Sequence, residues 1–560
     1  FILSAIKNGA KIIVTNKKKD GLKNGILFIK SRNVRKLLAE VSFKIYNKIP
    51  KNIIAITGTN GKSSIADFYY QILNFNNKKV ASIGTLGVKS KNFKINLSNT
   101  TIDPIKLGKI LNNLKKQNVD HVIMEASSHG LEQNRLDGLL FNMGIFTNLS
   151  QDHLDYHKNF RSYLKAKLYL FENLIKKRGN VITDKEIPEF KKIKKITLNK
   201  SLKLYSINDK KNNFQYLSHE FKGESQVLKI KDNNSIYKIQ INLIGKIQLK
   251  NILMAVIAAK KSNIDIKKIF RVIHKIKSVE GRFERVGKIK NKSKVILDYA
   301  HTPEALKTCL KNIKEQFPNK KISLLFGCGG NRDQNKRAKM GKIGDIYADK
   351  IYLTDDNPRF ENPNKIRKEI KKGIKKQKIY EISSRKKAII EAINQLKTGE
   401  ILLVAGKGHE KTQDFGYKKI FFSDKKIILE AIKIKNSNLS VNLKFNIIKE
   451  LSGNKKISSK LNLKKIRINS REVKKDDIFF AIKGKKNDGN KYIDQALKKK
   501  ASLVVVNQIK KNKNISRQIK VKDSLKFLTE GSKIFRQNIN TKIIAITGSC
   551  GKTTLKELLG

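Results

Sequence analysis

The stretch from residue 53 to residue 64, IIAITGTNGKSS, combines the residue types that bind nucleotide phosphates. The apolar run up to Ile56 predicts a buried strand, the glycines at 58 and 61 predict a sharp turn, and the residues after Lys62 have helical apolar spacing. In such a turn the backbone N–H groups, the helix N-terminus and the lysine would face phosphate oxygens. Ile56 replaces the first glycine of the full G-x4-G-K-[ST] pattern. The stretch still predicts a nucleotide site.

Two further stretches place polar side chains directly after apolar runs. HVIMEA at 121–126 brings Glu125 to the end of a predicted strand, and a carboxylate is the kind of ligand that a nucleotide's metal ion prefers. TNLSQDHLDYH at 147–157 gathers acidic and histidine side chains, including Asp152 and His153. The first stretch alone also fits an ordinary turn with a solvated glutamate, and the histidines of the second could be structural. Beside a phosphate loop, the two together favour a catalytic site.

Lysine dominates the composition, and the 560 residues carry a formal net charge of +74. A nucleic-acid-binding surface is one explanation of this charge. The lysines are spread over all segments, however, which favours a general compositional bias. The three cysteines lie far apart, so they predict neither a disulfide framework nor a metal site and fit a cytoplasmic protein. No apolar run approaches membrane-spanning length.

The elements that must position the candidate residues alternate between apolar strands and helical patterns. In residues 47–283, and again in 284–435, this alternation predicts mostly parallel, doubly wound sheets. Ligands bind at the carboxyl ends of the strands in such sheets. Residues 205–242 instead predict antiparallel strands, and residues 1–46 predict a small helix–strand–strand–helix domain.

The chain also contains an internal repeat. FILSAIKNGAKIIVTN at 1–16 aligns with YIDQALKKKASLVVVN at 492–507, and IIAITGSCGKTT at 543–554 repeats the phosphate loop. Two related modules therefore follow each other, and we expect a fragment at both ends. The expected domains are 1–46 (truncated, N-terminal), 47–283 (central), 284–435 (C-terminal), 436–540 (small α/β domain of the second module) and 541–560 (start of a second phosphate-loop domain).

Short motifs with chemical character occur along the whole chain: TGTNGKSS, SNTT, MEASSHGLEQNR, FTNLSQDHLDYH, GRFERV, DYAHTPEAL, GCGGNRD, DDNPR and GKGHE. Together they resemble the Mur ligase superfamily, the ATP-dependent amide-forming enzymes of peptidoglycan precursor synthesis. The resemblance implies a multidomain α/β fold with a small UDP-binding domain, a central P-loop ATPase domain with a parallel sheet, and a C-terminal Rossmann-like domain. The segment after residue 440 resembles the beginning of a superfamily member that adds D-alanyl-D-alanine, which implies a fusion of two ligases.

Within this superfamily the chain is similar to the enzymes that add meso-2,6-diaminopimelate to UDP-N-acetylmuramoyl-L-alanyl-D-glutamate. The resemblance implies that ATP and Mg2+ are used, that the D-glutamate carboxylate becomes an acyl phosphate, and that the diaminopimelate amine then forms the amide. Alternatives are a lysine-adding ligase, a folylpolyglutamate synthetase-like ligase, and an inactive ligase fold that binds polyanions. Beyond the two substrates, we expect no specific nucleic-acid partner and no membrane insertion.

The motif matches imply roles for individual residues. The implied catalytic and metal-binding residues are Lys62, Ser63, Glu125, His153 and Lys167, the last as a carbamate. The implied ATP contacts are Gly58, Thr59, Asn60, Gly61, Lys62, Ser63, Ser64, Asn251, Arg282, Asp298, Tyr299 and His301. The implied contacts to the UDP-linked substrate are Thr100, Thr101, Ser127, Gln133 and Arg135. The second phosphate loop has Gly548, Gly551, Lys552 and Thr553 at the matching positions.

The motif DDNPR at 355–359 marks the diaminopimelate-adding members of this superfamily. Diaminopimelate carries a distal carboxylate that lysine lacks, and Arg359 offers a fork of donors that can pair with it. With lysine as the substrate that guanidinium would stay unpaired, which disfavours lysine. The implied contacts to diaminopimelate are Arg332, Asp356, Asn357, Arg359, Gly406 and Glu410, with Glu410 suited to the distal ammonium.

Overall fold

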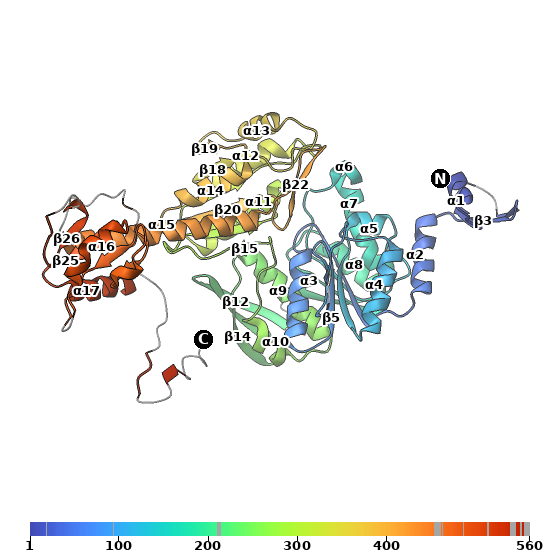
Figure 1. Cartoon of the computed structure of the whole chain (residues 1–560). Coiled ribbons are helices and arrows are strands. Elements are labelled where there is room, and N and C mark those ends of the chain that lie inside the picture. Colours follow the sequence, from blue (N-terminus) through green and yellow to red (C-terminus); the bar gives the residue numbers. More distant parts are fainter. Residues whose placement is uncertain are drawn as a thin grey trace. The chain divides into compact units, whose positions relative to one another are not determined.

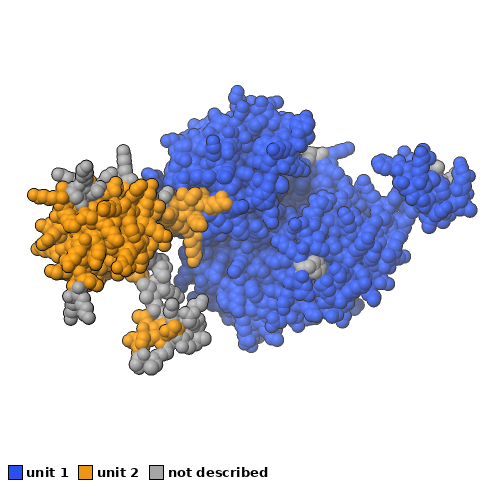
Figure 2. Space-filling view, in the orientation of Figure 1, with its two compact units in different colours: residues 1–287, 294–429 blue, residues 288–293, 430–560 orange. Residues whose placement is uncertain are grey.

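The computed structural model describes residues 1–17, 20–92, 94–209, 214–452, 461, 463–484, 487–511, 515–537, 545–548 and 552–553. The chain divides into two units (Figure 2). Unit 1 comprises residues 1–287 and 294–429, and unit 2 comprises residues 288–293 and 430–560. Each unit is described by itself below.

The N-terminal segment of unit 1 has its own small sheet. Its elements are α1 (Ile2–Lys7), β1 (Ile12–Thr15), β2 (Gly21–Lys23), β3 (Ile26–Lys30) and α2 (Val34–Ile45). β1 pairs with β3 in parallel, and β2 pairs with β3 antiparallel. The predicted order of helix, two strands and helix is confirmed. The extra strand β2 was not predicted, because three residues are too few to show an alternating pattern.

Unit 1 contains an eight-stranded sheet in the order β11-β10-β9-β4-β8-β5-β6-β7. Its strands are β4 (Asn52–Thr57), β5 (Val80–Gly84), β6 (Gly87–Lys89), β7 (Lys94–Ile95), β8 (His121–Glu125), β9 (Phe141–Phe146), β10 (Ile175–Asp184) and β11 (Lys203–Ile207). In Figure 1 the label of β5 stands between those of the helices at residues 62–75 and 104–116, α3 and α4. The strand pairs are parallel except for β5 with β6 and β6 with β7. The predicted mostly parallel sheet is therefore confirmed.

Helices cover both faces of this sheet. The helices of this part of unit 1 are α3 (Lys62–Phe75), α4 (Pro104–Lys116), α5 (Ser128–Glu132), α6 (Leu154–His157), α7 (Phe160–Tyr169), the π-helical turn Leu170–Leu174, α8 (Phe190–Asn199), α9 (Lys246–Lys261) and α10 (Ile266–Ile273). Ile54 and Ile56 of β4 pack into one core with α3 and α9, whereas Ile53 and Ala55 pack into a second core with α4. Because both faces are buried, the strands are apolar throughout rather than alternating.

A three-stranded antiparallel sheet follows the central sheet in the chain. It consists of β12 (Phe214–Lys222), β13 (Ser225–Asp232) and β14 (Ser235–Ile241). Its inward side chains, such as Leu228 and Ile239, join the core that contains α3 and α9. This confirms the antiparallel strands predicted for residues 205–242.

The last part of unit 1 has a six-stranded sheet in the order β15-β16-β20-β17-β18-β19. Its strands are β15 (Glu284–Arg285), β16 (Lys294–Asp298), β17 (Ile322–Phe326), β18 (Lys350–Leu353), β19 (Lys378–Glu381) and β20 (Ile401–Ala405). Only β15 runs antiparallel to its neighbour. The helices here are α11 (Pro303–Gln316), α12 (Lys336–Tyr347), α13 (Pro363–Lys371) and α14 (Arg385–Gln395), and β21 (Thr412–Asp414) pairs with β22 (Lys419–Phe421).

Unit 2 has a four-stranded parallel sheet in the order β23-β24-β25-β26. Its elements are β23 (Ile466–Arg467), a 3-10 turn (Ser470–Glu472), β24 (Ile478–Phe480), a 3-10 turn (Gly489–Tyr492), α16 (Ile493–Lys498), β25 (Leu503–Val506), a 3-10 turn (Ile515–Arg517), β26 (Gln518–Lys520) and α17 (Ser524–Gln537). Helix α15 (Asp424–Ser452) contains the boundary between the units, at residues 429 and 430, close to the domain boundary expected at 435 and 436. Of the second phosphate loop, Gly548, Lys552 and Thr553 are described, and Gly551 lies outside the described residues. Among the described residues, no helix has the length and apolarity needed to cross a membrane.

Candidate active site

The first phosphate loop connects β4 to α3, as the sequence predicted. Gly58 and Gly61 both have positive φ values, of 139° and 89°. A Cβ at Gly58 would lie 1.9 Å from Oγ1 of Thr147, so only glycine fits there. The ammonium of Lys62 donates hydrogen bonds of 2.8 Å to the carbonyl oxygens of Gly58 and Thr59. The lysine therefore lies over the turn whose N–H groups would hold phosphate.

Glu125, at the end of β8, is held by a set of hydroxyl and amide donors. Its Oε1 accepts hydrogen bonds from Oγ of Ser63 (2.9 Å) and from the backbone N–H of Thr85 (3.0 Å). Its Oε2 accepts one from Oγ1 of Thr85 (3.1 Å). A buried carboxylate next to a hydroxyl, beside a phosphate loop, provides the hard oxygen ligands that Mg2+ requires. Sequence reasoning missed Thr85, although its position just after β5 was a signal that could have identified it.

Lys167, on α7, reaches the same loop from another direction. Its side chain is 1% exposed, its Nζ donates to the carbonyl of Gly58 at 2.9 Å, and it lies 4.5 Å from the ring centre of Tyr163. Burial, followed by the charge of Lys62, holds the pKa of Lys167 well below its usual value. Neutral amines react with CO2, so this environment fits the expected carbamate. In the part of the chain that the structure describes, no group of three or more His, Cys, Asp or Glu side chains is placed to hold a metal ion. The predicted metal ligands include only two residues of these types, Glu125 and His153, so this finding does not bear on them.

A cavity of unit 1 brings the phosphate-loop residues together with residues from beyond β16. Its lining includes Thr59, Asn60, Gly61, Lys62, Ser63, Ser64, Thr85, Thr100, Glu125, Ser127, Ser128, Asp152, His153, Tyr163, Lys167, Arg282, Tyr299 and His301. The predicted ATP contacts Arg282 and Tyr299 lie against each other, with the guanidinium 4.4 Å from the ring centre. Most of the residues predicted to bind ATP or metal thus share one cavity.

Three predicted ATP contacts, Gly58, Asn251 and Asp298, are not in the lining of this cavity. Asn251 packs beside Gly61 and donates to Oε1 of Gln248 at 3.2 Å. Asp298 is half-buried and accepts hydrogen bonds from the backbone N–H groups of Phe283 (2.6 Å) and Ala300 (2.7 Å). Burial raises the pKa of Asp298 above its usual value. Asp298 thereby holds the backbone at Phe283 and Ala300, on either side of β16.

The residues predicted to contact the UDP-linked substrate fall into three places. Thr100 and Ser127 line the phosphate cavity. Thr101 is buried, and its hydroxyl donates to the carbonyl of Glu125 at 2.9 Å, so its side chain orients the end of β8. Gln133 and Arg135 line a separate groove between α2 and α4. The other residues of that groove, which sequence reasoning missed, are Arg35, Leu38, Ser98, Asn99, Ile102, Asp103, Pro104 and Lys106.

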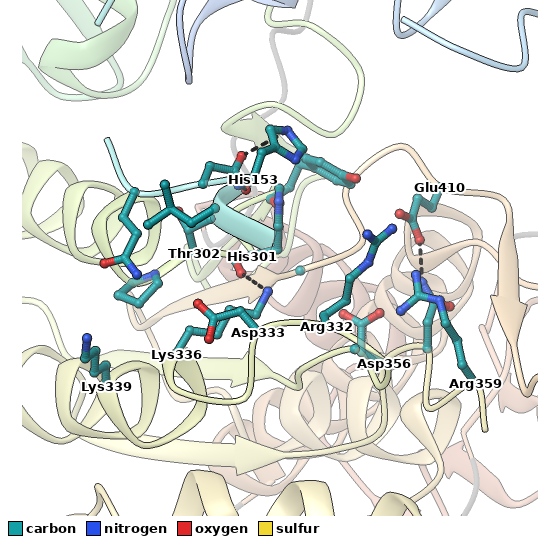
Figure 3. Close-up of a pocket in the computed structure, with 18 residues that line it drawn as sticks. His153, His301, Thr302, Arg332, Asp333, Lys336, Lys339, Asp356, Arg359 and Glu410 are labelled. Atoms are coloured by element: carbon teal, nitrogen blue, oxygen red, sulfur yellow. Dashed lines mark hydrogen bonds and ion pairs between the residues drawn. The ribbon is translucent and has the colours of Figure 1, made fainter. Parts of the chain in front are cut away.

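A second cavity collects all six residues predicted to contact diaminopimelate (Figure 3). The loops that follow β16, β17, β18 and β20 carry most of its lining, so it lies at the carboxyl ends of the parallel strands. In the view of Figure 3, Arg359 and Glu410 lie to the right and His153 and His301 in the centre. The lining comprises Gln151, Asp152, His153, Leu154, Tyr299, His301, Thr302, Pro303, Gly329, Arg332, Asp333, Lys336, Lys339, Asp356, Asn357, Arg359, Gly406 and Glu410.

Charged groups of both signs lie in this second cavity. Arg359 has a φ of 51°, and its Nη1 donates to the carbonyl of Gly330 at 2.7 Å. Oε2 of Glu410 accepts from Nδ2 of Asn357 at 3.0 Å. Burial alone would raise the pKa of Glu410, but neighbouring Lys407 and Asn357 lower it below its usual value. The site can therefore pair a carboxylate with Arg359 and an ammonium with Glu410.

The two cavities share four lining residues, Asp152, His153, Tyr299 and His301. The ring of His301 makes a 2.9 Å hydrogen bond through Nδ1 to the carbonyl of Tyr299, which can only accept. Burial lowers the pKa of His301, so the imidazole is neutral near neutral pH and Nε2 is an acceptor. Two ligands, one in each cavity, would therefore come closest to each other at these four residues.

Comparisons with known proteins bear on both units. Residues 56–259 match the family model described as Mur ligase middle domain, residues 281–408 match the Mur ligase glutamate ligase domain, and residues 462–540 match the catalytic domain of the Mur ligase family. A protein of Rickettsia conorii is 40% identical over 443 residues, which cover 78% of this chain and 90% of that protein. The chain belongs to the Mur ligase family. Its members are ATP-dependent ligases.

The named relatives of this Mur ligase have one activity in common. The Rickettsia conorii protein is named UDP-N-acetylmuramoyl-L-alanyl-D-glutamate–2,6-diaminopimelate ligase. A protein of Zymomonas mobilis with the same name is 36% identical over 436 residues, covering 77% of this chain and 89% of that protein. A solved structure of a ligase with this name is 28% identical, with a TM-score of 0.57, and covers 77% of this chain and 88% of that one.

A further solved structure, a MurF ligase of Thermotoga maritima in complex with ADP, is 16% identical with a TM-score of 0.53 and shows the shared fold alone. It covers 78% of this chain and 91% of that one. For unit 2, the match to the catalytic domain model places it in the Mur ligase family. The expected fusion with a D-alanyl-D-alanine-adding ligase is not supported by these comparisons.

Proposed function

We propose that this chain joins meso-2,6-diaminopimelate to UDP-N-acetylmuramoyl-L-alanyl-D-glutamate at the expense of ATP. The observation that carries the proposal is the pair of cavities in unit 1. One is lined by the phosphate loop, and the other by the residues that suit a substrate with two carboxylates and two amines. Because they share Asp152, His153, Tyr299 and His301, an activated carboxylate and an incoming amine can meet.

In the first step, the D-glutamate carboxylate attacks the γ-phosphate of ATP and forms an acyl phosphate and ADP. The loop N–H groups and Lys62 would hold the phosphates and offset the negative charge that gathers in the transition state. Ser63, Glu125, His153 and carbamylated Lys167 would hold Mg2+, which supplies further charge neutralisation when bound. The Glu125 carboxylate is kept in place for this role by Thr85.

In the second step, the diaminopimelate amine attacks the acyl carbon, and phosphate leaves from the tetrahedral intermediate. The amine must lose a proton on the way. His301 lines both cavities, is neutral near neutral pH, and has Nε2 as its acceptor, so it fits the role of proton acceptor. Asp152, also shared by both cavities, is the alternative acceptor of the same proton.

Discrimination against lysine would come from the far end of the second cavity. Arg359 and Arg332 provide guanidinium groups for the distal carboxylate, which lysine lacks. Glu410 provides an ionised partner for the distal ammonium. A substrate that leaves a buried or half-buried donor of the protein unpaired, as lysine would, is rejected more strongly than one that only lacks an apolar contact. This favours the diaminopimelate-adding reaction over the lysine-adding and folylpolyglutamate synthetase-like alternatives.

The experiment is a phosphate-release assay with ATP, Mg2+ and the UDP-linked dipeptide. Release with diaminopimelate that falls to background when either diaminopimelate or the dipeptide is omitted supports the proposal. Equal release with L-lysine would favour a lysine-adding ligase. Absence of release with any amine, together with salt-sensitive polyanion binding, would favour an inactive ligase fold.

For the second module we propose that residues 436–540 are the small N-terminal domain of another Mur ligase and that residues 541–560 begin its phosphate-loop domain. The match of residues 462–540 to a model of the Mur ligase family supports only the assignment of this segment to that family. A D-alanyl-D-alanine-adding activity for a longer chain would be tested by the same assay with D-alanyl-D-alanine and the UDP-linked tripeptide. Because the reaction consumes ATP, we propose the cytoplasm as the compartment.

A further inference from the structure

Lys407 lies within GKGHE, directly after β20, and none of the motif roles above uses it. Its side chain is fully buried. A buried ammonium is costly unless several acceptors surround it. The acceptors around Lys407 therefore identify the side chains that it holds in place.

The acceptors of Lys407 belong to the proposed diaminopimelate site. Its Nζ donates to Oδ1 of Asn357 at 2.8 Å and to Oε2 of Glu410 at 2.9 Å, and it lies 3.9 Å from Oδ1 of Asp356. Asn357 closes the triangle by donating from Nδ2 to Oε2 of Glu410 at 3.0 Å. Lys407 itself is absent from the lining of the cavity.

These contacts fix the orientation of both side chains. Oδ1 of Asn357 also accepts from the backbone N–H of Asp414 at 3.0 Å, so the amide cannot flip without losing two hydrogen bonds. Nδ2 must then point to Glu410. Because Lys407 and Asn357 both use Oε2 of Glu410, its Oε1 is left for a ligand in the cavity.

We propose that Lys407 is a positioning residue that sets the recognition of diaminopimelate, by holding the Glu410 carboxylate in place and Asn357 in one orientation. The inference rests on the proposed function and adds a determinant of substrate specificity that does not touch the substrate. Lys407 is the cation that most lowers the pKa of Glu410, whereas for Asp356 it acts second to Arg385, which is also paired with Asp424 at 2.7 Å.

The pH dependence follows from the groups that face Glu410. Glu410 interacts electrostatically with these charged or titratable groups: Lys407, His409, Asp356, Arg385 and Tyr299. Burial alone would raise the pKa of Glu410, and Lys407 is the largest influence that lowers it. Removing this ammonium raises that pKa, so Glu410 becomes protonated sooner as the pH falls. The KM for diaminopimelate should then rise on acidification in the variant, over a range where it is flat in the parent chain.

The test compares Lys407→Met and Lys407→Gln with Lys411→Met, an exposed lysine on the same loop. We expect Lys407→Met to raise the KM for diaminopimelate roughly 30-fold, as for a buried acceptor left without its donor. The KM for ATP should change little, and the rise should grow as the pH falls. Lys407→Gln keeps a hydrogen-bond donor but has no charge. Its KM for diaminopimelate should therefore still rise on acidification, as in Lys407→Met. Lys411→Met should behave like the parent chain.

Several results would overturn the proposal. One is a Lys407→Met protein with an unchanged KM for diaminopimelate at every pH. Equal losses for ATP and diaminopimelate, or loss of the cooperative unfolding transition in both Lys407 variants, would make Lys407 a residue of general stability instead. Failure of the proposed function is distinguishable, because the parent chain itself would then release no phosphate with diaminopimelate.

Discussion

Arg359 provides the sharpest test of substrate choice. The perturbation is Arg359→Ala. The guanidinium is anchored by one hydrogen bond from Nη1 to the carbonyl of Gly330 at 2.7 Å, and its side chain is 25% exposed. Its Nε lies 3.9 Å from Oδ2 of Asp414, so this carboxylate also orients the guanidinium. The rest of the fork is directed to a cavity in which a substrate carboxylate would bind.

The expected magnitude follows from the hydrogen bonds that would be lost. A hydrogen bond to a charged group contributes about 1.5–3 kcal/mol, and a fork makes two. Because the side chain is partly exposed, we take the lower end, about 3 kcal/mol for the pair. At 1.36 kcal/mol for each factor of ten, kcat/KM for diaminopimelate should fall roughly 100-fold. The value for L-lysine should hardly change, because lysine has no distal carboxylate.

The assay is steady-state phosphate release with each amine, for the parent chain, Arg359→Ala and the control Arg161→Ala, which changes an exposed arginine on α7. The control should match the parent chain. A loss of less than about threefold with diaminopimelate would refute the role of Arg359. An equal loss with lysine would refute it as well, because the residue would then act on the fold and not on the distal carboxylate.

Three further predictions concern the first cavity and the C-terminal part of unit 1. Lys62→Met should lower ATP-dependent phosphate release by a factor of about 100 or more, because it removes the ammonium over the phosphate loop; full activity in this variant would contradict the assignment. Because burial lowers the pKa of Lys167, its amine loses its proton more readily and can react with CO2. Activity should therefore fall in bicarbonate-depleted buffer, recover on adding bicarbonate, and lose this response in Lys167→Met. Arg385→Met leaves the fully buried Asp424 without its 2.7 Å partner and should lower the free energy of unfolding by about 3–5 kcal/mol, measured by urea denaturation.

The sequence predicted the features that depend on neighbouring residues. The strand, turn and helix around Lys62 could be read from local periodicity and glycine placement, and so could the antiparallel strands of residues 205–242. The motif DDNPR pointed to Arg359 because its residues are adjacent in the chain. The parallel sheets followed from alternating strand and helix patterns, although the three-residue strand β2 was too short to be recognised.

Contacts between distant segments could not be predicted in this way. Thr85 reaches Glu125 from the turn after β5, and Lys407 reaches Asn357 from a loop fifty residues away. The position of Thr85 after a strand and that of Lys407 within GKGHE draw attention to them, but neither reveals its partner. Conversely, Asp298 matched a motif for ATP contacts, but its carboxylate is used by two backbone N–H groups and is not in the lining of the cavity. A motif indicates that a residue matters, and only its hydrogen bonds show how.

In the proposed reaction the D-glutamate carboxylate is phosphorylated in the first cavity and meets the amine of diaminopimelate from the second. The most direct measurement uses a UDP-linked dipeptide labelled with 18O in the γ-carboxylate and follows product and phosphate by mass spectrometry. We expect a product heavier by one diaminopimelate residue and one 18O atom transferred to the released phosphate. Product without labelled phosphate, or labelled phosphate with no gain of diaminopimelate, would contradict the proposed reaction.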